Sequence, residues 1–85
     1  MRLTDEIRSR LAAAFDPAVI EVVDESERHR GHAGYREGGE SHFRVLIRAR
    51  AFGPMNRLAR HRAVHEALGA AIIARVHALT LDVAP

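Results

Sequence analysis

The chain has 85 residues, which is enough for one small domain with a modest core, and 47% of them are hydrophobic, as in ordinary globular proteins. It contains no cysteine, so it can form no disulfide and offers no thiolate to zinc or to an iron–sulfur cluster. All thirteen basic residues are arginine, yet the formal net charge is only +2, which does not indicate a broad nucleic-acid-binding surface.

The N-terminal sequence is charged and lacks the apolar segment of a signal peptide. No apolar run approaches the ~18 residues that a membrane span needs. We therefore expect a single domain over residues 1–85 in the cytoplasm, without contact with a membrane.

The first predicted element is a helix that starts at Asp5 with Thr4 as its cap. It should end near Asp16-Pro17, because proline disfavours the helical conformation for the residue before it. Its apolar stripe has a spacing of four residues and consists of Leu3, Ile7 and Leu11.

Two strands are predicted next, at residues 18–24 and 42–49. The second alternates well, with one face formed by Phe43, Val45 and Ile47 and the other mostly by His42, Arg44, Leu46 and Arg48. Residues 25–40 between them show no periodicity, contain four glycines, and include His29 and His32. We expect a flexible loop that joins antiparallel strands as a wide hairpin, with His42 placed to bond across to the first strand.

A second helix should begin after the break at Phe52-Gly53-Pro54, with Asn56 as its cap. Gly69 either weakens or ends it, so residues 70–75 are its last turn or a separate short helix. The predicted apolar face holds Leu58, His61, Val64 or His65, Leu68 and Ile72, and the solvated face holds Arg57, Arg60, Arg62 and Glu66.

The last predicted element is a third strand at residues 76–83. Strict alternation would place Val76 and Ala78 on one face and His77, Leu79 and Leu81 on the other. The order helix, strand, strand, helix, strand predicts an α+β domain with a three-stranded sheet and its helices on one face.

Six histidines in 85 residues is a high count. His61 and His65 have the i,i+4 spacing of a helical metal-binding pair, but the glutamate of the HExxH zinc motif is absent, and His61 is better explained as a partly buried histidine. No motif of a hydrolase, a phosphate-binding loop or a dinucleotide-binding fold is present, so we do not expect an enzyme.

Three histidines are better candidates for metal ligands. His29 and His32 lie in a glycine-rich segment where no structural role demands imidazole, and His77 interrupts an apolar run, where it needs a cleft or a partner. Imidazole is a good neutral ligand for iron, and either loop histidine could approach His77 if the loop folds over the third strand.

Motifs spread over nearly the whole chain resemble the BolA family. They are Asp24-Glu25-Ser26, Ser41-His42-Phe43, Phe52, the segment RLARHR at 57–62 followed by Val64, His65 and Leu68, and Val76-His77-Ala78-Leu79. The turn at Phe52-Gly53-Pro54 departs from the family's usual Phe-x-Gly pattern. The resemblance implies the BolA fold, which is similar to a class II KH domain and agrees with the predicted order of elements.

The resemblance also implies a role as partner of a monothiol (CGFS) glutaredoxin in iron–sulfur cluster trafficking or iron homeostasis. In that family the two proteins hold a bridging [2Fe–2S] cluster, with sulfur ligands from the glutaredoxin and glutathione. The ligands carried over to this chain are His77 and His29, with His32 as the alternate. Alone, the chain should hold no cluster and be a monomer or weak homodimer.

Physical chemistry is consistent with this role. A chain without thiolates cannot hold such a cluster by itself, so binding requires a partner. Imidazole in place of thiolate lowers the negative charge at the iron and raises its reduction potential, and protonation at low pH would release the ligand.

The resemblance allows a second role, since bacterial BolA proteins are associated with transcription regulation, stress response and cell morphology. In that role Arg57, Arg60 and Arg62 would contact the phosphates of a nucleic acid. No GXXG loop, through which KH domains bind nucleic acid, accompanies these arginines in the segment before or within the predicted second helix.

Overall fold

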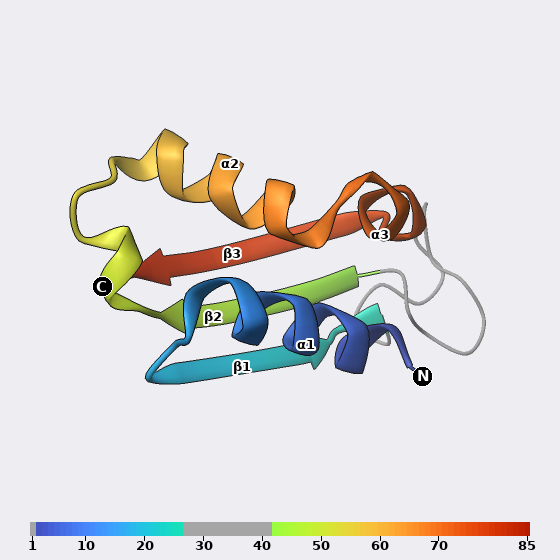
Figure 1. The fold of residues 1–85 in the computed structure, drawn as a ribbon. Helices are drawn as coiled ribbons and strands as arrows, with labels where there is room; N and C mark the ends of the chain where they lie inside the picture. Colours follow the sequence, from blue (N-terminus) through green and yellow to red (C-terminus); the bar gives the residue numbers. More distant parts are fainter. Residues whose placement is uncertain (1, 27–41) are drawn as a thin grey trace.

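Three helices lie on one face of a three-stranded sheet in the computed structural model, which describes residues 2–26 and 42–85 (Figure 1). The elements are α1 (Leu3–Phe15), β1 (Val19–Asp24), β2 (His42–Arg48), the 3-10 turn η2 (Arg50–Phe52), α2 (Arg57–Leu68), α3 (Ala70–Arg75) and β3 (Ala78–Ala84). The predicted α+β class is therefore confirmed, and the break after α2 makes a separate short helix. No helix in the described ranges is long and apolar enough to cross a membrane.

The strand order is β1-β2-β3, so β2 is the central strand. β1 pairs antiparallel with β2 from Val19 opposite Arg48 to Asp24 opposite Phe43, as the wide-hairpin prediction required. β3 runs parallel to β2, from Ala78 opposite His42 to Ala84 opposite Arg48. Parallel neighbours need a crossover connection, and α2 with α3 supplies it over the helical face of the sheet.

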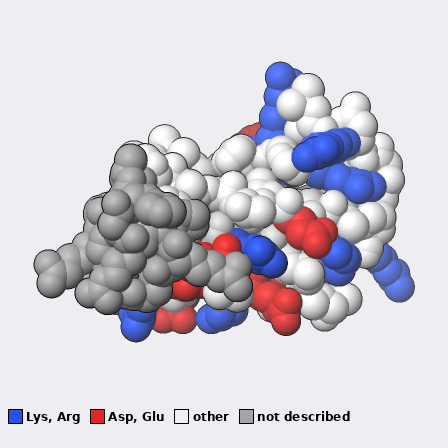
Figure 2. Space-filling view, turned by 180° about the vertical axis from the view of Figure 1, so that it is seen from behind, with Lys and Arg blue, Asp and Glu red and all other residues white. Residues whose placement is uncertain are grey.

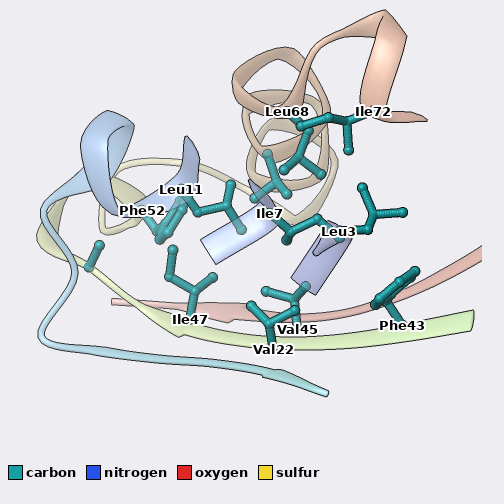
Figure 3. Close-up of a cluster of buried hydrophobic side chains, with 12 residues drawn as sticks. Leu3, Ile7, Leu11, Val22, Phe43, Val45, Ile47, Phe52, Leu68 and Ile72 are labelled. Atoms are coloured by element: carbon teal, nitrogen blue, oxygen red, sulfur yellow. The ribbon is translucent and has the colours of Figure 1, made fainter. Parts of the chain in front are cut away.

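One hydrophobic core fills the space between helices and sheet (Figure 3). Its sheet side is formed by the predicted face of β2, and the rings of Phe15 and Phe52 close one end with their centroids 4.6 Å apart. The buried hydrophobic residues are Leu3, Ile7, Leu11, Val22, Phe43, Val45, Ile47, Ala49, Phe52, Val64, Leu68 and Ile72.

The start of α1 differs from the prediction. The helix begins at Leu3 with Arg2 as its cap, so Thr4 is not the capping residue. The backbone carbonyl of Arg2 accepts hydrogen bonds from the N–H groups of Asp5 and Glu6, and the earlier start brings Leu3 into the core, where it is 1% exposed. The predicted end is correct, since Asp16 adopts the left-handed conformation that terminates the helix.

The cap of α2 is confirmed, because Asn56 Oδ1 accepts a hydrogen bond of 2.8 Å from the N–H of Ala59. The predicted apolar face is partly wrong. Leu58 is 58% exposed, and Ile72 reaches the core from α3. The buried residues of the helix are therefore only Val64 and Leu68, and Leu58 in its first turn faces solvent.

The predicted alternation in the third strand fails at its start. Val76 packs against the core, whereas His77 is exposed and does not share a face with Leu79 and Leu81. The cause is the end of α3, where the N–H of Val76 donates to the carbonyl of Ile73. The chain bends at His77, so the alternation of β3 begins only at Ala78.

Candidate histidine site at one end of the sheet

The end of β1 and the beginnings of β2 and β3 meet at one end of the sheet (Figure 1). This end brings together three motifs that lie far apart in the sequence: Asp24-Glu25-Ser26, His42 and His77. The pairing of Asp24 with Phe43 places the first motif beside His42. The pairing of His42 with Ala78 places His77, the residue before Ala78, at the same end of the sheet. The topology thus brings residues from three of the motifs noted in the sequence to the same end of the sheet.

Hydrogen bonds lock the end of β1 to the start of β2. Asp24 Oδ1 accepts from both the N–H of Ser26, at 2.9 Å, and the Ser26 hydroxyl. The Ser26 Oγ in turn accepts from the N–H of His42 at 3.2 Å, and the His42 carbonyl accepts from the N–H of Glu25 at 2.7 Å. The expected bond from His42 toward the first strand is therefore present, made by its backbone just beyond β1.

His42 and His77 form a tilted pair of imidazoles with unequal exposure. Their ring centroids are 5.2 Å apart, and the ring planes are inclined by 60°. His42 is buried, with 6% of its surface exposed, while His77 is exposed. The expectation that His77 needs a cleft or a partner rested on its desolvation, and His77 is exposed to solvent, with the ring of His42 beside it. His29 and His32 lie outside the described residues.

The three predicted arginines do not form one surface. Arg57 and Arg62 are exposed, and neither forms an ion pair or a side-chain hydrogen bond within residues 2–26 and 42–85. Arg60 is half-buried, and its Nε donates to the carbonyl of Phe52 at 2.9 Å, so it fastens α2 to η2. The first turn of α2 lies at the opposite end of the sheet from His77 (Figure 1).

The sheet face away from the helices carries charges of both signs (Figure 2). Arg48 Nη2 lies 3.0 Å from an Asp82 carboxylate oxygen, and Arg44 Nε lies 3.4 Å from a carboxylate oxygen of Glu25. Because these cations have anionic neighbours, this face presents no uniform positive field to a polyanion.

The donor atoms fit a metal centre only if it is shared with another molecule. Within the described ranges, no three His, Cys, Asp or Glu side chains are grouped as a metal site would require, and the whole chain has no cysteine. At this end of the sheet, the described residues offer the exposed imidazole of His77. This fits a cluster whose sulfur ligands come from elsewhere, and it does not fit a cluster enclosed by these residues.

Comparison with known proteins gives the family. The family described as BolA-like protein matches residues 11–85. This chain belongs to the BolA family. It is 41% identical over 81 residues to the Escherichia coli DNA-binding transcriptional regulator BolA, covering 95% of this chain and 73% of the relative. It is 45% identical over 83 residues to an uncharacterized Sinorhizobium protein encoded in the cobS 5' region, covering 96% and 89%.

Solved BolA structures have the same fold. BolA1 from Arabidopsis thaliana superposes with a TM-score of 0.82 at 27% identity, covering 99% of this chain and 92% of that one. None of these three names states an enzymatic activity. The resemblance inferred from the BolA motifs of the sequence is thus confirmed at the level of family and fold.

Sequence reasoning missed the burial of His42, the contact of its ring with His77, and the role of Ser26. Alternation assigned His42 to the face away from the helices, where exposure would be expected, and gave Ser26 no role. The only available signal was that both residues sit within the motifs that resemble the family.

Proposed function

We propose that this BolA-family chain is the partner of a monothiol glutaredoxin and co-ligates a bridging [2Fe–2S] cluster. The observation that carries the proposal is the exposed imidazole of His77, held beside a buried ring at the junction of three motifs. A chain with no thiol can take part in such a cluster only by adding a ligand to a set that another protein supplies.

The residues of this chain have separate roles in the proposal. His77 offers a neutral ring nitrogen, and His29 or His32 offers a second ligand. The cluster, when bound, supplies iron and sulfide for electron transfer or for delivery to other proteins. The β1–β2 junction, fixed by Ser26, keeps the chain's ligand-bearing end in one conformation while the partner docks.

Reconstitution with a monothiol glutaredoxin, iron, sulfide and glutathione tests the proposal. Mixing should change the visible absorption and circular dichroism of the glutaredoxin cluster, and His77→Ala should abolish that change. His65→Ala is the matched control, because His65 is also exposed but lies on α2. Separate His29→Ala and His32→Ala variants identify the second ligand by which of them alters the spectrum.

Two outcomes would count against the assignment. A His77→Ala complex with the wild-type visible spectrum would exclude His77 as a ligand. An equal loss of signal in His65→Ala would mean that the spectrum reports something other than ligation. Far-ultraviolet circular dichroism of each variant establishes that its fold is intact.

A second candidate function is DNA binding in transcription regulation. It is favoured by the exposed, unpaired guanidinium groups of Arg57 and Arg62 on α2, and by the 41% identical Escherichia coli relative that is named as a DNA-binding regulator. The hydrogen bond of Arg60 to Phe52 leaves that arginine less available for phosphates. The salt dependence of binding to duplex DNA tests this candidate, and the two functions use opposite ends of the molecule.

A further inference from the structure

We propose that His42 is a positioning residue for His77: its buried ring holds the exposed imidazole in one orientation before a partner arrives. The inference deepens the proposed function and rests on it for its consequence in the complex. The positioning itself is a property of the isolated chain and can be tested there.

The backbone of His42 is fixed from both sides. Its N–H donates to Ser26 Oγ at 3.2 Å, and its carbonyl accepts from Glu25 at 2.7 Å. Ser26 is itself 1% exposed and donates to the carboxylate of Asp24. His42 therefore starts the central strand from a rigid junction, and its ring is packed with only 6% of the residue exposed.

The backbone of His77 is held by its two neighbours. Val76 closes α3 through its bond to Ile73 and packs against the core, while Ala78 is paired with His42 across the sheet. The main freedom left to His77 is rotation of its side chain. An exposed histidine normally samples several rotamers, and a partner that needs one of them must offset the lost entropy.

The ring of His42 removes much of that freedom. Tilted aromatic pairs attract when their centroids are about 4.5–7 Å apart, and this pair is at 5.2 Å with an inclination of 60°. One side of the His77 imidazole is therefore covered by the side chain of a buried residue. Preorganisation of this kind improves binding without adding any contact to the partner.

Side-chain NMR of the isolated chain tests the inference. Three-bond coupling constants and NOEs should show one dominant His77 χ1 rotamer in the wild type. His42→Phe should keep that rotamer because an aromatic face remains, whereas His42→Ala should give averaged couplings. His65, exposed on α2 and without a ring partner, serves as an internal reference that is averaged in every sample.

A second variant protects the test against loss of the fold. His42→Leu fills the space without an aromatic ring and should release His77 as His42→Ala does. Averaged His77 couplings in the wild type, or a single rotamer in the folded Ala or Leu variant, would overturn the proposal.

The reconstituted complex separates this inference from the proposed function. Because preorganisation is lost, the affinity of the His42→Ala variant for the glutaredoxin should be roughly two- to tenfold lower than that of the wild type. The His42→Phe variant should recover the wild-type affinity. If His77→Ala leaves the cluster spectrum unchanged while His42→Ala frees the His77 ring, the proposed function fails and the positioning stands. If His77→Ala abolishes the spectrum while His42→Ala changes neither rotamer nor affinity, the positioning alone fails.

Discussion

Ser26 joins two motifs that lie sixteen residues apart. Its hydroxyl donates to the carboxylate of Asp24 and accepts from the N–H of His42, and the side chain is almost completely buried. A buried N–H without an acceptor is expensive, because it has given up its bond to water and gained nothing in return. A serine at this position therefore stabilises the junction far more than its small size indicates.

Ser26→Ala should lower the free energy of unfolding by about 1–3 kcal/mol, because it leaves the His42 N–H without its acceptor. Urea titration followed by circular dichroism measures the loss. Ser9→Ala on the exposed face of α1 is the control and should change stability little. Equal effects of the two substitutions would show that the Ser26 hydroxyl contributes nothing special.

The site was only partly predictable from individual residues. His77 could be singled out because an imidazole within an apolar run requires an explanation. The contact of His42 with the His77 ring could not be predicted, since period-two alternation assigns a residue to a face but does not say which distant segment lies beside it. That information enters with the register of β2 and β3, where 36 positions separate His42 from Ala78.

At the scale of elements, Gly69 forms the joint between α2 and α3. Gly69 has φ 85° and ψ 158°, a backbone conformation in which side chains are strained. Its N–H donates to the carbonyl of His65 and ends α2, and its carbonyl accepts from Ile73 within α3. Gly69 thus changes the direction of the chain between α2 and α3, and Ile72 reaches the core from α3.

Gly69→Ala should destabilise the protein by about 1–3 kcal/mol through backbone strain alone. A Cβ at this position would have room, since its nearest neighbour is the Arg10 guanidinium at 3.8 Å, so steric overlap adds nothing. Chemical denaturation gives the magnitude. A change below about 0.5 kcal/mol, as is usual for surface substitutions, would mean that the joint relaxes to an ordinary conformation without cost.

The elements themselves were largely predictable, and their ends were not. The apolar spacing of α1 and the alternation of β2 describe the buried faces correctly. The errors lie at Thr4, Leu58 and Val76-His77, where a helix starts early, a leucine in a first turn is exposed, or a helix end delays a strand. At such places tertiary packing outweighs the local pattern that a sequence displays.

At the scale of the whole molecule, charge is spread and not concentrated. The net charge of +2 arises from thirteen arginines and eleven acidic residues, and Figure 2 shows both signs on the sheet face. DNA affinity, if present, must therefore depend on a few local cations. Arg57 and Arg62 are the cations that remain unpaired among the arginines predicted for this role.

Replacing both residues, Arg57→Gln and Arg62→Gln, should weaken DNA binding and reduce the slope of log K against log salt by about 2, one for each phosphate contact. Fluorescence anisotropy with duplex DNA over a salt series measures the slope. Arg8→Gln is a control, because that arginine is already paired with Asp5. Binding with the same slope in the double variant would remove α2 as the DNA-contacting element.

The position of β3 at the edge of the described sheet has a consequence for the stability of the His42–His77 pair. Among the strands of residues 2–26 and 42–85, β3 pairs only with β2, so β3 can open locally while the β1–β2 pairing stays formed. Detachment breaks the pairing of Ala78 with His42 and carries the His77 ring away from its neighbour. A ligand that binds only when the His42 and His77 rings are in contact binds only the state in which β3 is paired with β2. By mass action, such a ligand increases the population of that state. Binding of such a ligand and the pairing of β3 are therefore thermodynamically coupled. A substitution that destabilises the pairing of β3 would also lower the affinity for the ligand, even if the substituted residue does not contact it.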